Sequence, residues 1–181
     1  YHYENALGLL GVMGVQYMPN TEWALGVSVK KGLDLSAKAS EQLIDATPNY
    51  KIDKQQDYDF LEYGYQTFPT SLSVGSCYFI SPYLLWTLDA TYYAAHESKI
   101  KSFSKKSVTS VATGVECYIT NQIPLRFGFY TNPSNSKYTS LGSYDIDLIG
   151  LTFSAGYETE LSTLSLILDY SWGTGTMGLQ D

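Results

Sequence analysis

Near its end the chain reads LSLILDYSW, from Leu164 to Trp172, and this stretch decides the fold class. Leucine, tyrosine and tryptophan occupy every second position, while Ser165, Asp169 and Ser171 fall between them together with Ile167. A period of two residues is that of a β-strand, whose successive side chains point to opposite faces. One apolar face that ends in two aromatic rings is typical of a strand whose outer side contacts lipid and then the membrane interface.

The same alternation recurs along the chain, and helical periodicity is rare. Together with the first stretch, the other clear segments predict about eight strands: residues 7–17, 23–30, 71–80, 86–94, 111–119, 125–130 and 149–157. On these strands the alternation predicts a lipid-facing set: Leu88, Phe127, Leu151, Leu166 and Leu168. The expected fold class is therefore all-β, an antiparallel transmembrane β-barrel.

The connections between these segments alternate in length. Short turns with Pro, Asn or strongly polar residues are expected at 19–21, 81–83, 121–124 and 158–160, and long polar loops at 45–60, 97–107 and 132–144. Short turns at one end and long loops at the other are the layout of an outer-membrane barrel. A soluble β-sandwich would also alternate, but its two inner faces form a shared apolar core. The second face here holds Gly, Ser, Thr and isolated charges, which favours the barrel.

Composition narrows the class further. The chain has 181 residues, enough for one domain spanning 1–181, and only 16% of them are charged against about 25% in a soluble domain. A chain that is 44% hydrophobic and 15% aromatic is not disordered, and a net charge of -7 argues against nucleic-acid binding. No run approaches the roughly 18 apolar residues of a transmembrane helix.

Cysteine and histidine offer little chemistry. Cys77 and Cys117 fall on different strand pairs and opposite faces, so we expect free thiols rather than a disulfide. The two histidines could bind zinc only with the help of carboxylates, and no metal or other cofactor is expected. His96-Glu97-Ser98 contains the side-chain types of a hydrolase, but adjacent strand residues point apart and cannot converge. The sequence therefore predicts no enzyme.

Several hairpins resemble those of one family. The run FPTSLSVG at 68–75, a turn at 81–84, and the strand WTLDATY at 86–92 are similar to a hairpin of the FadL family of outer-membrane transporters. That family carries long-chain fatty acids and aromatic hydrocarbons. The run GVECY at 114–118 and its partner PLRFGFY at 124–130 resemble a second pair of family strands, and WALGVS at 23–28 resembles a strand that enters a long extracellular excursion.

The resemblance implies passive uptake of hydrophobic small molecules by a monomer in the outer membrane of a Gram-negative-type bacterium. Its partners would be the ligand, outer-membrane lipid and lipopolysaccharide, with no nucleic acid. Family members are 14-stranded barrels with an N-terminal hatch, and this chain matches only the C-terminal part. Since it starts at Tyr1 without a methionine, we expect a processed product or a piece of such a barrel. The alternative is a self-contained eight-stranded barrel with a structural or adhesive role and an interior filled by side chains.

The candidate ligand-binding residues are four charged side chains on the predicted lumen face: Asp89, Glu116, Arg126 and Asp169. They either pair with one another across neighbouring strands or line the lumen, with Arg126 as a fork that could hold a carboxylate.

A second cluster consists of four lysines in one predicted loop: Lys99, Lys101, Lys105 and Lys106. They form either a solvated loop tip or a contact with lipopolysaccharide phosphates, and in both cases we expect the loop on the extracellular side.

Overall fold

The structure is a computed structural model that describes residues 2–44, 52–59, 68–99, 104–137 and 144–177. These residues form nine strands: β1 (His2–Tyr17), β2 (Trp23–Ile44), β3 (Ile52–Asp59), β4 (Ser71–Ser81), β5 (Leu84–Tyr93), β6 (Val108–Thr120), β7 (Ile123–Asn132), β8 (Tyr144–Glu158) and β9 (Thr163–Met177). In the described ranges there is no helix, and hence none with the length and hydropathy to cross a membrane. The prediction of an all-β, antiparallel chain is confirmed.

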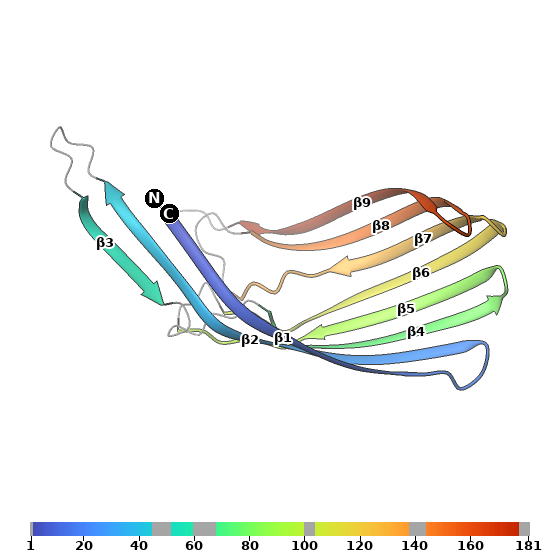
Figure 1. Ribbon diagram of the computed structural model, residues 1–181, viewed down its shortest axis with the longest axis horizontal. Coiled ribbons are helices and arrows are strands. Elements are labelled where there is room, and N and C mark those ends of the chain that lie inside the picture. The colour runs from blue at the N-terminus through green and yellow to red at the C-terminus, as the bar shows by residue number, and fades with distance from the viewer. Residues whose placement is uncertain (1, 45–51, 60–67, 100–103, 138–143, 178–181) are drawn as a thin grey trace.

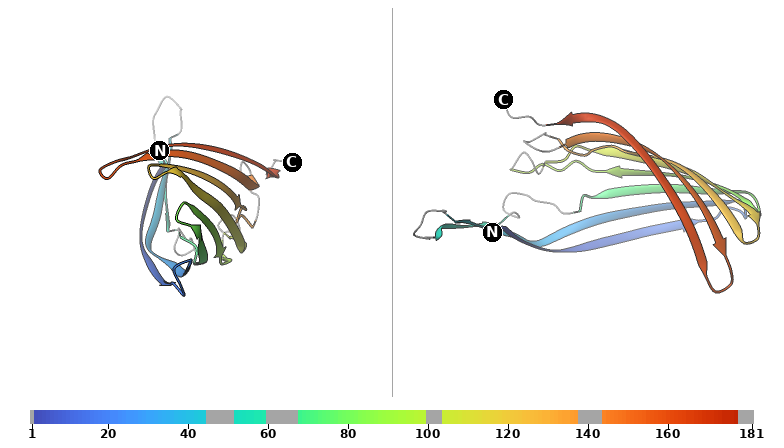
Figure 2. Two further views of the ribbon diagram at one scale, coloured as in Figure 1. Left: turned by 90° about the vertical axis from the view of Figure 1, so that its right-hand side faces the viewer. Right: turned by 90° about the horizontal axis from the view of Figure 1, so that it is seen from above.

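The strands build a single sheet in the order β1-β2-β4-β5-β6-β7-β8-β9, with β3 paired to β2 outside this path (Figure 1). Every pairing is antiparallel. The sheet is strongly twisted, as long antiparallel sheets are (Figure 2). Its edges are β1 and β9, and no pairing joins them within the described residues. Because there is one sheet and no second layer, the β-sandwich is not the architecture of this part of the chain.

The short turns lie together at one end of the sheet, as predicted (Figure 1). Each is closed by a local polar group. The Asn20 side-chain oxygen accepts hydrogen bonds from the main-chain N–H groups of Glu22 and Trp23, at 3.0 and 2.8 Å. Ser81 and Thr159 accept main-chain N–H groups in the turns that follow them. Such side-chain acceptors replace missing main-chain partners and fix the turn.

One predicted connection is wrong in part. The expected loop at 45–60 contains strand β3, and β2 continues to Ile44, well beyond the predicted end at residue 30. Lys38 to Ile44 of β2 pairs with β3, while β1 pairs along the other edge of β2 as far as Glu41. Main-chain hydrogen bonds hold this pairing, and they do not require alternating apolar side chains. The sequence pattern therefore did not reveal β3. The result is a three-stranded extension beyond the main sheet (Figure 1).

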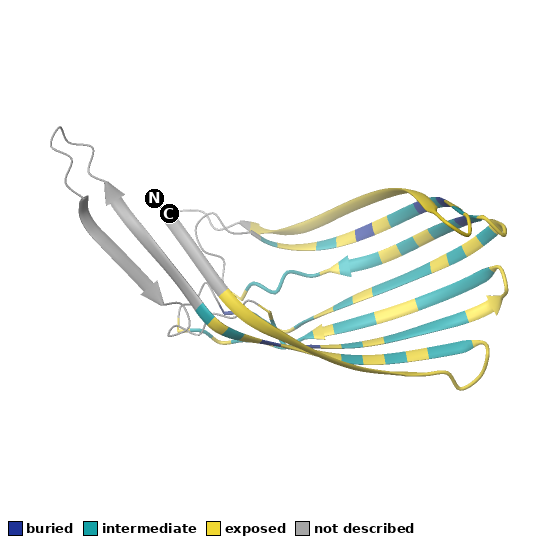
Figure 3. Ribbon diagram, in the orientation of Figure 1, coloured by how far each residue is buried: buried dark blue, intermediate teal, exposed yellow. Residues whose placement is uncertain are grey.

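Burial alternates along the inner strands and separates two faces, while the described side chains of the edge strands β1 and β9 are exposed throughout (Figure 3). Among the described residues, the side chains with less than 2% exposure are only Pro124 and Ser104, so no apolar core lies inside this single layer. The register shows which residues lie on the same face, because residues paired directly across antiparallel strands point to the same side of the sheet. In one row across the sheet, Gly75 pairs with Asp89, and Asp89 with Ala112, which pairs with Tyr130.

Candidate functional site

One face of the sheet is apolar and exposed. We call it the apolar band, and its residues come from β1, β2 and β4 to β9: Met13, Val15, Leu25, Val27, Val29, Leu72, Val74, Leu88, Val111, Val115, Phe127, Phe129, Ile149, Leu151, Leu164, Leu166, Leu168, Tyr170 and Trp172. The five residues predicted to face lipid all belong to it, with exposed fractions from 39% at Leu88 to 66% at Leu166. Soluble monomers rarely expose apolar patches beyond a few hundred Å². The band therefore needs a partner or a solvent other than water.

Two polar side chains within the apolar band, Trp86 and Thr113, are hydrogen-bonded inside the sheet. The indole N–H of Trp86 donates to the Thr113 hydroxyl at 2.9 Å, and that hydroxyl donates to the Thr87 carbonyl at 2.8 Å. Phe127 and Phe153 pack with ring centroids 5.0 Å apart. A polar group that already has a partner loses little when it leaves water.

The apolar band is hollowed over β5 to β9. The hollow measures about 620 Å³, and its wall is aromatic and aliphatic, with Trp86, Phe127, Phe129, Phe153 and Leu168 among the lining residues. Of the four predicted site residues, only Asp169 is among its lining residues in the described chain.

The opposite, polar face holds all four predicted site residues. Glu116 pairs with Arg126 across β6 and β7, Asp169 pairs with Thr152, and Thr152 pairs with Gly128, two residues from Arg126. Asp89 lies opposite Ala112, four residues from Glu116 on β6. The register therefore places all four positions on one face of the sheet.

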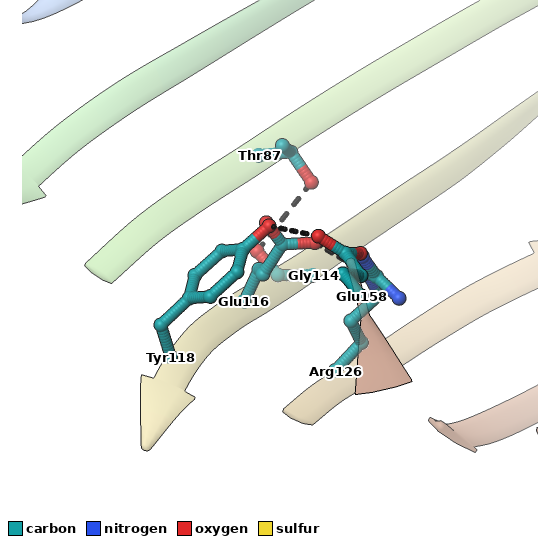
Figure 4. Close-up of polar contacts among 6 residues, drawn as sticks. All are labelled: Thr87, Gly114, Glu116, Tyr118, Arg126 and Glu158. Atoms are coloured by element: carbon teal, nitrogen blue, oxygen red, sulfur yellow. Dashed lines mark hydrogen bonds and ion pairs between the residues drawn. The ribbon is translucent and has the colours of Figure 1, made fainter. Parts of the chain in front are cut away.

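Arg126 is the centre of a polar cluster (Figure 4). Its Nε donates to Glu116, and a terminal guanidinium nitrogen donates to Glu158 Oε1 at 2.9 Å. The Tyr118 hydroxyl donates to the second oxygen of Glu158 at 3.1 Å. Both carboxylates are about three-quarters shielded from solvent. Because both of them pair with Arg126, its guanidinium group is already engaged with protein side chains.

Glu158 is the site residue that sequence reasoning missed, because its position was assigned to a turn. The available signal was the two-residue alternation of the strand: Glu158 comes two residues after Gly156 and four after Ser154, which lie on the polar face of β8. Only the tertiary structure brings it beside Arg126, 32 residues earlier in the chain.

Asp89 and Asp169 are not part of that cluster, so of the four charges only Glu116 and Arg126 pair with each other. The Tyr130 hydroxyl donates to Asp169 at 3.2 Å. Asp89 lies over Gly75, where any Cβ would collide with its carboxylate. The two aspartates are separated from Arg126 by the strand positions between them, beyond direct ion-pair contact.

A second hollow, of about 500 Å³, lies on the polar face between β1, β2, β4 and β5. Small residues make room for it, including Gly26, Ser28, Ser73 and Gly75, and Asp89 is its one charged lining residue in the described chain. The polar face is therefore divided into a part filled by the Arg126 cluster and a part left open.

At the long-loop end, two connections pack against each other. Lys105 forms antiparallel bridges with His96 and Ser136, and Lys106 forms an ion pair with Asp145 at 3.2 Å. Asp145 precedes the apolar band of β8 by four residues, and a hydrogen bond from Ser134 together with the Lys106 ammonium group lowers the pKa of its carboxyl. The predicted lysine cluster is therefore divided, since Lys106 faces a carboxylate, while Lys101 lies outside the described residues.

Cys77 and Cys117 are free thiols on opposite faces, as predicted. Within the described ranges, no group of three His, Cys, Asp or Glu side chains is placed to hold a metal ion.

Comparison with known proteins gives no match: no family model, no curated protein and no solved structure is significantly similar to this chain.

Proposed function

We propose that this chain forms wall strands of an outer-membrane β-barrel of the FadL type, which takes up fatty acids or aromatic hydrocarbons by passive passage. The exposed apolar band is the observation that carries the membrane part of the proposal. Leaving a Leu or Phe side chain in water instead of an apolar medium costs about 1.5–3 kcal/mol. A bilayer removes this cost over the entire face at once.

Strand length and backbone pairing support the same setting. Strands β4, β5, β6 and β7 contain 11, 10, 13 and 10 residues, against about 9–11 for a tilted membrane-spanning strand. The turns are short at one end and the connections long at the other. In a bilayer the free edges of β1 and β9 need partners, since an unpaired main chain in lipid is very costly.

Direction restricts how the edges can be closed. Along the eight-strand path every neighbour is antiparallel, so β1 and β9 run in opposite directions. They can pair directly, which gives the self-contained small barrel, or through an even number of further strands, which gives a larger barrel. The family resemblance favours the larger barrel.

Passage of an apolar molecule is supported by the open half of the polar face. The hollow of about 500 Å³ is lined mainly by glycine, serine and aliphatic residues, with Asp89 as a polar anchor. A hollow with few charged groups suits a hydrophobic ligand. Glu116, Arg126 and Asp169 line the same face, where the Arg126 cluster braces the wall rather than offering a free guanidinium.

The test uses purified protein in liposomes. Entry of a fluorescent fatty acid and of naphthalene should be faster than in empty vesicles, while glucose entry and ion conductance stay at background. Ser73→Trp fills the polar hollow and should slow entry. Leu72→Trp, at the neighbouring position on the apolar band and not among the lining residues of the hollow, should not. Open-pore ion conductance without binding of either ligand would argue for a porin instead.

The self-contained barrel is a real second candidate because eight strands lie on one continuous path. Spin labels on β1 and β9 distinguish the two in membranes. Neighbouring strands lie about 5 Å apart, so direct closure gives strong dipolar coupling, whereas interposed strands separate the labels. If β1 and β9 pair directly, the role is structural or adhesive, and vesicles show no accelerated uptake.

A further inference from the structure

A smaller hollow lies at the long-loop end of the polar face, apart from both hollows described above. It measures about 240 Å³. Tyr93 at the end of β5, Ser110 near the start of β6 and Asn132 at the end of β7 form its floor. Pro133 and Asn135, in the segment after β7, form part of its rim.

The rim of this hollow is held in place by the packed connections. The Lys106 main-chain N–H donates to the Asn135 carbonyl at 2.8 Å, and the Ser134 N–H donates to the Asp147 carboxylate at 2.9 Å. The ion pair between Lys106 and Asp145 fixes the same segment from the side of β8. A rim restrained from two neighbouring elements presents its polar groups in a fixed arrangement, which lowers the entropy cost of binding.

The polar groups of the hollow are neutral and point to a neutral ligand. In the described part of the chain, the Tyr93 and Ser110 hydroxyls and the side-chain amides of Asn132 and Asn135 have no protein hydrogen-bond partner. Each of these groups both donates and accepts, which is also the property of a ligand hydroxyl. No charged side chain lines the hollow, so nothing there would compensate a buried phosphate or carboxylate.

Size and apolar surface restrict the ligand further. The volume is below the roughly 300–1,000 Å³ of sites for drug-sized molecules, so it suits one ring rather than a chain. Tyr93 and Pro133 supply apolar surface against which the C–H face of a sugar ring can pack. We propose that this hollow binds a single neutral sugar ring, either a free monosaccharide or a residue of a surface glycan. The site goes beyond the proposed uptake function, and neither depends on the other.

The test is saturation-transfer NMR on the full chain in a detergent without a sugar headgroup. The probes are methyl glucoside, methyl galactoside and methyl N-acetylglucosaminide, with glucuronate and glucose 6-phosphate as charged counterparts. We expect transfer to the ring protons of at least one neutral glycoside and none to the charged sugars. If only a neutral surface oligosaccharide, without phosphate or carboxylate groups, gives transfer, the site stands and its source is the cell surface.

The variants locate the site. Tyr93→Ala should weaken binding about tenfold or more, through loss of the ring surface and a hydroxyl. Tyr93→Phe keeps the ring and should weaken it less, and Asn132→Ala tests a second wall should Tyr93→Ala fail to fold. Tyr92→Ala, on the opposite face, is the control and should bind as the unmodified chain does. Absence of transfer to all neutral sugars, equal binding by Tyr93→Ala, or preferential binding of the charged sugars would overturn the proposal.

Discussion

At the scale of single residues, Arg126 shows how a charged side chain can be essential to a wall without being free for a ligand. It is shared between Glu116 and Glu158, and Tyr118 completes the cluster through Glu158. Two carboxylates paired with one guanidinium more than neutralise its charge, so an incoming carboxylate would have to displace one of them. The cluster is consequently better suited to fixing β6, β7 and β8 in register than to capture.

Replacing Arg126 should accordingly destabilise the chain more than it changes ligand binding. Arg126→Ala leaves Glu116 and Glu158 facing each other, and we expect a loss of about 1–3 kcal/mol in the free energy of unfolding. Urea titration of the protein in lipid vesicles measures this loss. The double variant Arg126→Ala/Glu116→Ala should be less unstable than the sum of the two single variants, because it removes the stranded charge. Strictly additive losses would mean that the ion pair contributes nothing.

At the scale of elements, neighbouring residues of β9 lie on opposite faces of the sheet. Leu164, Leu166 and Leu168 alternate with Ser165 and Asp169, and the pairing with β8 fixes which side each occupies. If the apolar band contacts lipid, adjacent residues of this strand must differ sharply in their tolerance of charge.

We expect Leu166→Arg to lower the stability of the membrane-inserted protein by about 2–4 kcal/mol near the bilayer midplane. Ser165→Arg, the matched neighbour on the polar face, should cost clearly less. Refolding into vesicles at graded urea concentration compares the two. Equal losses would contradict the assignment of the faces.

The close contact between β8 and β9 at Gly173 leaves no room for a side chain, and this leads to a second prediction at the scale of elements. A Cβ at Gly173 would collide with the main-chain oxygen of Asp147, which cannot move without breaking the pairing. Gly173→Ala should therefore cost about 1–3 kcal/mol. Gly26→Ala is the control, since a Cβ at Gly26 meets nothing within 4 Å. Thermal or urea unfolding that ranks Gly26→Ala as the more damaging change would refute this account of the β8–β9 contact.

At the scale of the whole molecule, the chain is a twisted single-layer sheet with turns at one end and packed connections at the other (Figures 1 and 2). In an outer membrane the longer connections lie outside. The two ends should therefore differ in their access to reagents added to intact cells.

Single cysteines test this orientation in a Cys77→Ser/Cys117→Ser background. Lys99→Cys, in the connection between β5 and β6, should react with a membrane-impermeant maleimide on intact cells. Asn121→Cys, in the short turn between β6 and β7, should react only after the outer membrane is opened. The reverse pattern would invert the proposed topology, and labelling of both would argue against insertion.

The sequence by itself determined eight of the nine strand segments, the alternation of their two faces and the place of the short turns. These are local properties: alternation needs only neighbouring residues, and a turn needs a Pro, an Asn or a hydroxyl within a few positions. The tertiary structure decided what pairs with what. It pairs β3 with β2 and brings Glu158 to Arg126 across 32 residues. It also brings Asp169 to Tyr130 across 39 residues and pairs Lys106 with Asp145. Such contacts depend on the register between strands distant in the chain, and a shift of one residue would turn every side chain to the other face.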